Sequence, residues 1–157
     1  EKILASLESK GIRVVVDATK DLLLNVLKYH PFLIKPNNHE LGEMFGTVCK
    51  TDEDIVHYAK KLQEKGAVSV LISMAGDGAI LITEDGQNIK MGTPKGKVVN
   101  SVGAGDSMVA GFITGYIRGG NYEEALKSGT AAGSATAFSE GLASLEMYEK
   151  MLKQITE

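Results

Sequence analysis

A glycine-rich turn leads directly into a helical pattern at residues 100–107, and its residue types could bind an anion. The segment reads Asn-Ser-Val-Gly-Ala-Gly-Asp-Ser, and apolar residues then recur at helical spacing over 108–117. The first amides of a helix have no intrahelical partner and stand at the positive end of its dipole, and glycines let that backbone wrap an anion closely. Asp106 would place a carboxylate beside the anion. In the alternative, structural interpretation, Gly103 and Gly105 make a tight turn and Asp106 caps the helix.

A second loop, Ser73-Met74-Ala75-Gly76-Asp77-Gly78, follows the apolar run 68–72. Ligands of open α/β sheets bind outside the carboxyl ends of the strands, so the position of this loop favours a ligand contact. A plain glycine loop that leads into a hairpin accounts for the same residues.

A third loop, Lys35-Pro36-Asn37-Asn38-His39-Glu40, follows the apolar run 32–34. Asn37 and Glu40 have the spacing of a capping box, which would begin a short helix. In the functional interpretation, their oxygens reach a hydrated Mg²⁺, an ion that usually keeps several of its waters.

These loops lie between apolar runs and helical patterns that alternate along the chain. This alternation predicts an α/β fold with a mostly parallel sheet, helices on both faces, and an antiparallel hairpin at one edge. Gly111 and Gly115, four residues apart, favour close packing between helices. The expected strands are 14–16, 32–34, 68–72, 79–83, 88–91 and 98–99, and the expected helices are 2–10, 21–29, 38–45, 52–66, 106–118, 121–139 and 145–155.

The composition excludes several classes of protein. A chain of 157 residues with 43% apolar residues and a net charge of −3 is suited to one folded domain and is not intrinsically disordered. The near-neutral charge argues against nucleic acid as a partner, and no stretch approaches the ~18 apolar residues of a membrane span. The single cysteine, Cys49, cannot form an internal disulfide, so we expect a reducing, cytoplasmic location.

The beginning of the chain suggests a piece of a longer protein. It starts at Glu1 within a helical pattern that contains Ile3, Leu4 and Leu7 and ends near Gly11. We therefore expect that further residues precede this sequence in the intact protein.

The three loops together resemble the ribokinase-like (PfkB-type) carbohydrate kinase family. Lys35-Pro36-Asn37-x-x-Glu40, Ser73-x-x-Gly76-x-Gly78 and Val102-Gly103-Ala104-Gly105-Asp106-Ser107 occur in the family's order. The Lys-Pro-Asn form is similar to the 1-phosphofructokinase and tagatose-6-phosphate kinase branch. The resemblance implies a three-layer α/β/α sandwich. In it, residues 1–157 would be the C-terminal nucleotide-binding and catalytic portion, without the N-terminal sugar-binding and lid portion.

The same resemblance implies an activity and its cofactors. The protein would transfer a phosphoryl group from ATP, with Mg²⁺, to a hydroxyl of a sugar phosphate. The favoured acceptor is fructose 1-phosphate, which would give fructose 1,6-bisphosphate. Tagatose 6-phosphate or another sugar is the alternative acceptor, and a homodimer is a possible state of the full-length protein. The isolated chain would be inactive, and a non-catalytic nucleotide-binding fragment is the alternative from another functional class.

The resemblance also implies roles for individual residues. Asp106 would be the catalytic base, and the amides of Gly103, Ala104, Gly105 and Asp106 would form the anion hole. Asn37 and Glu40 would organise the waters of Mg²⁺. The nucleotide site would comprise Lys35, Ser73, Met74, Ala75, Gly76, Asp77, Gly78, Gly105 and Asp106. Met74-Ala75 departs from the Leu-Gly that is usual in the family at this point.

Overall fold

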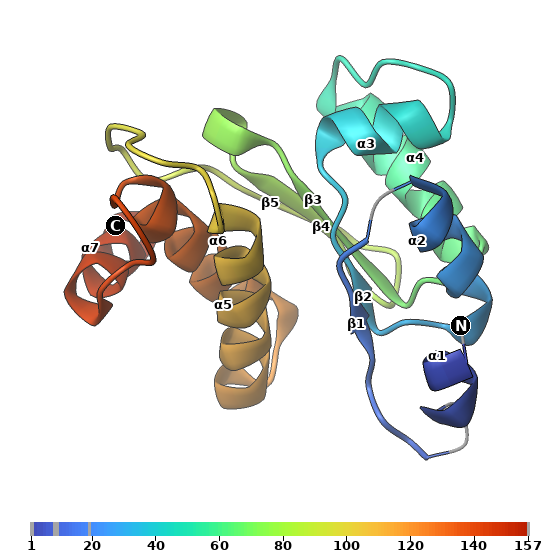
Figure 1. The fold of residues 1–157 in the computed structure, drawn as a ribbon. Helices are drawn as coiled ribbons and strands as arrows, with labels where there is room; N and C mark the ends of the chain where they lie inside the picture. The colour runs from blue at the N-terminus through green and yellow to red at the C-terminus, as the bar shows by residue number, and fades with distance from the viewer. Residues whose placement is uncertain (1, 8–9, 19, 157) are drawn as a thin grey trace. The chain divides into compact units, whose positions relative to one another are not determined.

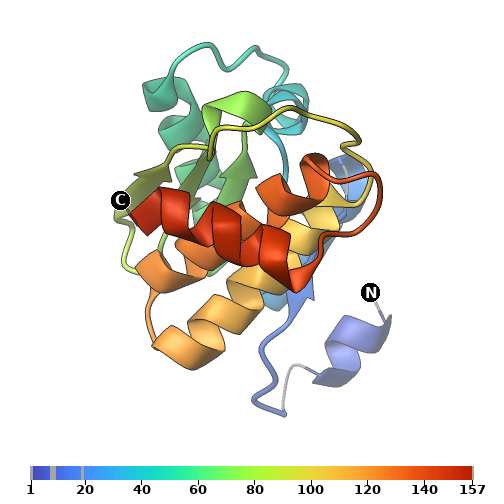
Figure 2. The ribbon, with the colours of Figure 1, turned by 90° about the vertical axis from the view of Figure 1, so that its left-hand side faces the viewer.

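The computed structural model describes residues 2–7, 10–18 and 20–156, which form two compact units (Figures 1 and 2). The first unit comprises residues 1–74 and 80–89, and the second comprises residues 75–79 and 90–157. The helices of the first unit are α1 (Lys2–Leu7), α2 (Lys20–Val26), the 3₁₀ helix η1 (Leu27–Tyr29), α3 (Asn38–Met44) and α4 (Asp52–Glu64). Those of the second are the 3₁₀ helix η2 (Ala75–Asp77), α5 (Ala104–Gly119), α6 (Tyr122–Ala137) and α7 (Leu145–Thr156).

Five strands form one sheet in the order β1-β2-β3-β4-β5. They are β1 (Val15–Val16), β2 (Leu33–Ile34), β3 (Ser69–Ser73), β4 (Ala79–Ile82) and β5 (Asn88–Met91). The β1–β2 and β2–β3 pairs are parallel. Residues 74–78 are too few for a parallel crossover, so β4 runs antiparallel to β3. The predicted hairpin is confirmed by the bond from the Thr83 N–H to the Gln87 carbonyl, 3.0 Å. The α/β fold class with a mixed sheet is therefore confirmed.

The core of the first unit lies between helices α2, α3 and α4 and the strands they cover (Figure 1). Both residues of β2 and the first four of β3 are buried, as the apolar runs 32–34 and 68–72 predict, whereas both residues of β1 are only half-buried. Strand β4, expected only as part of the hairpin, is also buried throughout. The helices contribute the apolar residues that recur at helical spacing. The buried core side chains of this unit are Leu23, Leu27, Ile34, Leu41, Ile55, Ala59, Leu62, Ala67, Val70, Ile72, Met74, Ile80 and Ile82.

A capping box begins α4, as the sequence predicts. The Thr51 hydroxyl accepts a hydrogen bond from the Asp54 N–H at 3.2 Å, and the Asp54 carboxylate accepts one from the Thr51 N–H at 3.0 Å. The N–H groups of Lys50 and Thr51 hold the pKa of Asp54 below its ordinary value, because both donate to its carboxylate. The box satisfies N–H groups that the first turn of a helix leaves without partners.

The second unit is built on the close packing of α5 against α6. A Cβ atom at Gly111 would lie 2.6 Å from the Ser128 carbonyl oxygen, and one at Gly115 would lie 2.5 Å from that of Glu124. The prediction that these glycines serve helix packing is therefore confirmed. Helix α7 packs on α6 through Met151, which is 2% exposed.

Some expected boundaries differ from the observed ones. No strand forms at 98–99, where the N–H groups of Val99 and Asn100 instead both donate to the Ala137 carbonyl, at 2.8 and 3.1 Å. The predicted strand was wrong because two adjacent β-branched residues favour extended backbone whether or not a partner strand is present. The first helix ends at Leu7, and residues 8–9 of the expected helix lie outside the described part of the chain. Within the described part, no helix has the length and apolarity that crossing a membrane requires.

Candidate functional site

The first turn of α5 presents backbone N–H groups that have no acceptor in the part of the chain that the structure describes. Gly103 is the N-cap, with φ of 79°, a left-handed conformation that glycine adopts without steric cost. Within the described residues, no hydrogen-bond acceptor is found for the N–H groups of Gly103, Gly105 and Asp106. The Ala104 N–H is the exception among the four predicted donors, because it donates to the Ser101 carbonyl at 3.2 Å. The turn can therefore offer three amide donors to an anion.

The Asp106 carboxylate stands beside these amides and is exposed. Asp106 is the third residue of α5 and not its N-cap, so the structural alternative in which Asp106 caps the helix is wrong. Across the described ranges its side chain has no hydrogen-bond or ion-pair partner. Among the described residues, the carboxylate is therefore free to accept hydrogen bonds from a ligand.

The loop that precedes α5 is fixed by Asn100. The side-chain amide of Asn100 donates to the Glu140 carbonyl at 3.1 Å, and its side-chain oxygen accepts from the Val102 N–H at 3.0 Å. An asparagine that bonds the backbone two residues later forms an Asx turn. This turn sets the path of the chain just before the exposed amides.

The loop after β3 begins with a buried residue and continues with exposed ones. Met74 is 5% exposed and packs in the core of the first unit, so its side chain is not available to a ligand. Ala75, Gly76 and Asp77 are exposed. The Thr93 hydroxyl holds this turn through the Ala75 carbonyl at 3.1 Å and the Gly76 carbonyl at 2.9 Å.

Ala75 has φ of 49°, in the left-handed region that side chains disfavour by about 1–2 kcal/mol. The resemblance described above implies glycine at this position, so the departure seen in the sequence coincides with a strained backbone. Gly78 has a different constraint. A Cβ atom there would lie 2.0 Å from the Met91 carbonyl oxygen, and its φ is 91°. Packing and conformation thus require glycine at position 78 before any ligand is considered.

The residues that follow β1, β2 and β3 are linked to one another at the carboxyl ends of these strands in the first unit. Asn37 forms an isolated parallel bridge with Ser73, and the Ser73 N–H donates to the Pro36 carbonyl at 3.3 Å. Lys35 is buried, 7% exposed, and its ammonium lies 3.4 Å from the Asp17 carboxylate, which follows β1. A charge that is removed from water in this way requires a partner of opposite sign.

Asn37 and Glu40 form the predicted capping box. The Asn37 side-chain oxygen accepts from the Glu40 N–H, and the Glu40 carboxylate accepts from the Asn37 N–H, both at 2.8 Å. No cluster of three or more metal-binding side chains is found among the described residues. Any Mg²⁺ near Asn37 and Glu40 would therefore keep most of its ligands as waters or phosphate oxygens.

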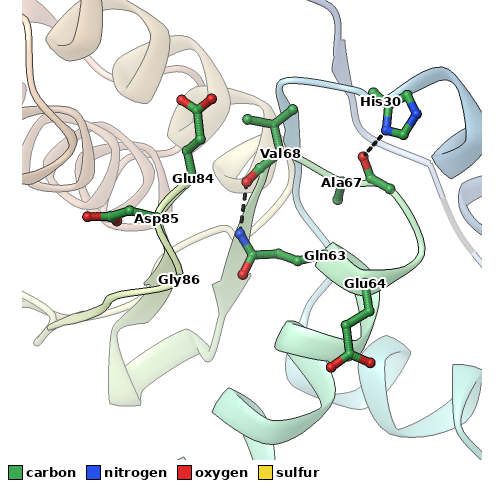
Figure 3. A pocket seen from close by; sticks show the side chains of 9 residues that line it. His30, Gln63, Glu64, Ala67, Val68, Glu84, Asp85 and Gly86 are labelled. Atoms are coloured by element: carbon green, nitrogen blue, oxygen red, sulfur yellow. Dashed lines mark hydrogen bonds between the residues drawn. The ribbon is translucent and has the colours of Figure 1, made fainter.

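A cavity of about 510 Å³ lies at the opposite end of the parallel strands (Figure 3). His30 and Val68, which precede β2 and β3, line it together with the hairpin turn 84–86. Gln63 of α4 fixes its wall by donating to the carbonyls of Val68 and Thr83, both at 2.8 Å. No residue that the sequence singles out for chemistry lines this cavity, and it lies away from the strand ends at which α/β sheets bind ligands.

Sequence reasoning missed two hydroxyl residues of the second unit. Thr93 bonds to carbonyls 17 and 18 residues away, and Thr136 bonds to Ser107, 29 residues away. Neither residue belongs to a recognisable motif, because such contacts depend on the tertiary fold. The loops themselves were found because glycine and cap residues mark them locally.

Comparison with known proteins gives consistent matches over this chain. Residues 1–147 match the model of the pfkB family of carbohydrate kinases. The chain is 49% identical over 155 residues to 1-phosphofructokinase of Bacillus subtilis, which covers 99% of the chain and 51% of that protein. It is 40% identical over 145 residues to D-tagatose-1-phosphate kinase of Bacillus licheniformis, which covers 92% of the chain and 47% of that protein.

Solved structures agree with these matches. A Staphylococcus aureus protein assigned as a phosphofructokinase superposes with a TM-score of 0.92 at 45% identity, over 98% of this chain and 50% of that one. Ribokinase of Arabidopsis thaliana, solved with ribose and ATP, superposes with a TM-score of 0.84 at 25% identity, over 97% of this chain and 51% of that one. The chain thus spans about half the length of the relatives it matches.

Proposed function

The chain belongs to the pfkB family of carbohydrate kinases, and on that premise we propose that the intact protein transfers a phosphoryl group from ATP to a sugar phosphate. The observation that carries this proposal is the first turn of α5. There, the N–H groups of Gly103, Gly105 and Asp106 find no acceptor among the residues that the structure describes, and an exposed carboxylate lies beside them. Phosphoryl transfer requires mainly positioning and charge stabilisation, and preorganised amides supply the second.

In the proposed reaction, the hydroxyl oxygen of the sugar phosphate attacks the γ-phosphorus of ATP, and the Asp106 carboxylate accepts the proton of that hydroxyl. The bond between that phosphorus and the β–γ bridging oxygen breaks, and ADP leaves with the electron pair. The amides of Gly103, Gly105 and Asp106 donate to the oxygens of the transferring group, where negative charge is spread. The Ala104 N–H donates to the Ser101 carbonyl, so it stabilises the turn and is not assigned to the phosphoryl group.

We assign the ATP contacts to the exposed turn Ala75–Asp77, which Thr93 holds through two carbonyls, and to Ser73 and Gly105. Met74 and Gly78 are assigned structural roles, because one is buried in the core and the other lies against the Met91 carbonyl. Lys35 would contact phosphate oxygens, with Asp17 holding its ammonium. Except for Lys35, whose ammonium is already paired with Asp17, this division limits side-chain contacts with the nucleotide to residues that the core and the Met91 carbonyl leave free.

Mg²⁺, when bound, would neutralise phosphate charge, and the residues present fit a hydrated ion. The capping box uses one oxygen of Glu40 and the side-chain oxygen of Asn37 as acceptors, and an ionised carboxylate has further lone pairs. These residues would therefore orient metal-bound waters without forming a closed protein cage. A homodimer and a cytoplasmic location complete the proposal for the intact protein.

Fructose 1-phosphate is the proposed acceptor, because a relative named 1-phosphofructokinase is 49% identical to this chain. Tagatose 1-phosphate is the second candidate, since a relative named for that substrate is 40% identical. Tagatose 6-phosphate, expected from the sequence as the alternative, is the third.

A substrate panel tests this proposal directly. The purified full-length protein is assayed for ADP release with ATP, Mg²⁺ and each sugar phosphate in turn, and the 157-residue chain alone is assayed in parallel. We expect kcat/KM for fructose 1-phosphate to exceed that for the other sugars by about tenfold or more, which corresponds to about 1.4 kcal/mol. The chain alone is expected to be inactive. Absence of ADP release with every sugar phosphate would contradict the proposal.

A further inference from the structure

The C-terminal end of α6 holds the first turn of α5 through a buried hydroxyl. Thr136 is 1% exposed, and its Oγ1 donates a hydrogen bond to the Ser107 Oγ at 2.8 Å. The same Oγ1 accepts from the Ala143 N–H at 3.4 Å. Ser107 directly follows Asp106, and its N–H makes the first bond within α5, to the Gly103 carbonyl at 2.9 Å.

The other end of the amide-bearing segment is attached to the same part of the fold. The N–H groups of Val99 and Asn100 donate to the Ala137 carbonyl, and the Asn100 side chain donates to the Glu140 carbonyl. Residues 101–106 therefore lie between two attachment points, Asn100 on one side and Ser107 on the other. Both are hydrogen-bonded to residues in the segment 136–140. The position of the exposed amides thus depends on the end of α6.

The close contacts between the first turn of α5 and α6 are van der Waals contacts. A Cβ atom at Gly133 would lie 3.1 Å from the Ala104 carbonyl oxygen and 3.2 Å from the Met108 Cβ, so the helices touch closely. Such van der Waals contacts have no direction, whereas a hydrogen bond prefers a narrow range of angles. The Gly103 N-cap has no side chain that could orient the turn.

We propose that Thr136 is a positioning residue for phosphoryl transfer, which acts through Ser107 to orient Asp106 and the exposed amides of α5. This inference rests on the proposed function. Thr136 itself touches neither substrate nor nucleotide in this proposal. Its contribution is to hold the reacting groups in the geometry that the transferring phosphoryl group requires.

The expected effect follows from the sensitivity of catalysis to geometry. A displacement of about 1 Å can lower a rate by about 10²-fold. Thr136→Val keeps the shape of the side chain and replaces the hydroxyl with a methyl group of similar size, so the helix contact remains. We expect kcat of the intact enzyme to fall about 10- to 100-fold, with the KM for ATP changed by less than about threefold.

Three variants separate positioning from stability. Thr136→Ser keeps the hydroxyl and is expected to retain kcat within about threefold of the original enzyme. Thr130→Val is the matched control. Thr130 lies on the same helix, is also 1% exposed, and its hydroxyl finds no partner among the residues described. Ser107→Ala should lower kcat as Thr136→Val does, and the double variant should lose no more than either single one.

The assay measures kcat and KM of the intact enzyme with saturating sugar phosphate, and thermal unfolding of each variant. Loss of kcat in Thr136→Val, rescue in Thr136→Ser and no loss in Thr130→Val would support the proposal. Equal kcat in Thr136→Val and the original enzyme would overturn it, as would equal losses in Thr136→Val and Thr136→Ser.

A second readout keeps this test separate from the proposed function. Hydrogen exchange of the Ser107 amide, which is bonded to the Gly103 carbonyl at 2.9 Å, is measured by nuclear magnetic resonance in the intact protein without substrate. Faster exchange in Thr136→Val and unchanged exchange in Thr130→Val would support the positioning role even if no sugar phosphate is turned over. Unchanged exchange in Thr136→Val would overturn it even if the kinase activity is established.

Discussion

Replacing Asp106 with asparagine in the intact enzyme is expected to lower kcat by about 10²–10⁴-fold, the usual contribution of a general base. The change keeps the size of the side chain and removes its ability to accept a proton. The amides of Gly103 and Gly105 remain in place, so binding of ATP should change little. The prediction follows from the exposed Asp106 carboxylate, which has no partner in the described protein.

The measurement is steady-state kinetics at saturating fructose 1-phosphate, together with ATP binding by calorimetry. Glu149→Gln is the matched control, because Glu149 is an exposed carboxylate on α7 and has no proposed part in the reaction. Full activity in Asp106→Asn would remove Asp106 from the role of base. Equal losses in both variants would point to a general effect of charge.

Gly78→Ala is expected to destabilise the intact protein by about 2–5 kcal/mol. Two costs combine. The new Cβ would lie 2.0 Å from the Met91 carbonyl oxygen, an overpacking that typically costs about 1–3 kcal/mol, and φ of 91° is unfavourable for alanine by about 1–2 kcal/mol. Because the contacted atom is backbone, it cannot turn away as the end of a side chain can.

Gly76→Ala is the matched control two residues earlier. A Cβ atom at Gly76 would meet nothing within 4 Å, so we expect a change within about 0.5 kcal/mol. Denaturant unfolding of both variants gives the comparison. Similar midpoints for the two variants would show that the glycine at position 78 is not required by the fold, and a ligand contact would then be its better explanation.

The sequence predicted those features that depend on neighbours in the chain. The capping boxes at Asn37 and Thr51 were recognised because their residues are three apart and bond to one another. The buried strands were recognised because an uninterrupted apolar run has few other uses in an α/β fold. The glycine-rich turn before α5 was recognised for the same local reason.

What the sequence could not predict depends on contacts between distant residues. Val98 and Val99 favour extended backbone and therefore predict a strand. In the structure, the N–H of Val99 instead donates to the carbonyl of Ala137, at the end of α6. Nothing local indicates that Met74 would be buried while Ala75 is exposed. Thr136 gives no signal at all, since its bond to Ser107 exists only once α5 and α6 are packed.

The loop at Asn37 and Glu40 shows how one pair of residues can satisfy two interpretations. Their reciprocal hydrogen bonds at 2.8 Å fully explain the pair as the start of α3. The same bonds hold the Glu40 carboxylate in one orientation, which would suit the binding of metal-bound water. The structural role is observed, and the metal role belongs to the proposal.

The most direct test of the central claim is a crystal structure of the intact enzyme with ADP, Mg²⁺, aluminium fluoride and fructose 1-phosphate. We predict that the N–H groups of Gly103, Gly105 and Asp106 donate to the fluoride ligands. We also expect the Asp106 carboxylate to lie about 2.6–3.2 Å from the acceptor hydroxyl. An aluminium fluoride group bound away from the first turn of α5, or an Asp106 carboxylate out of reach of that hydroxyl, would contradict it.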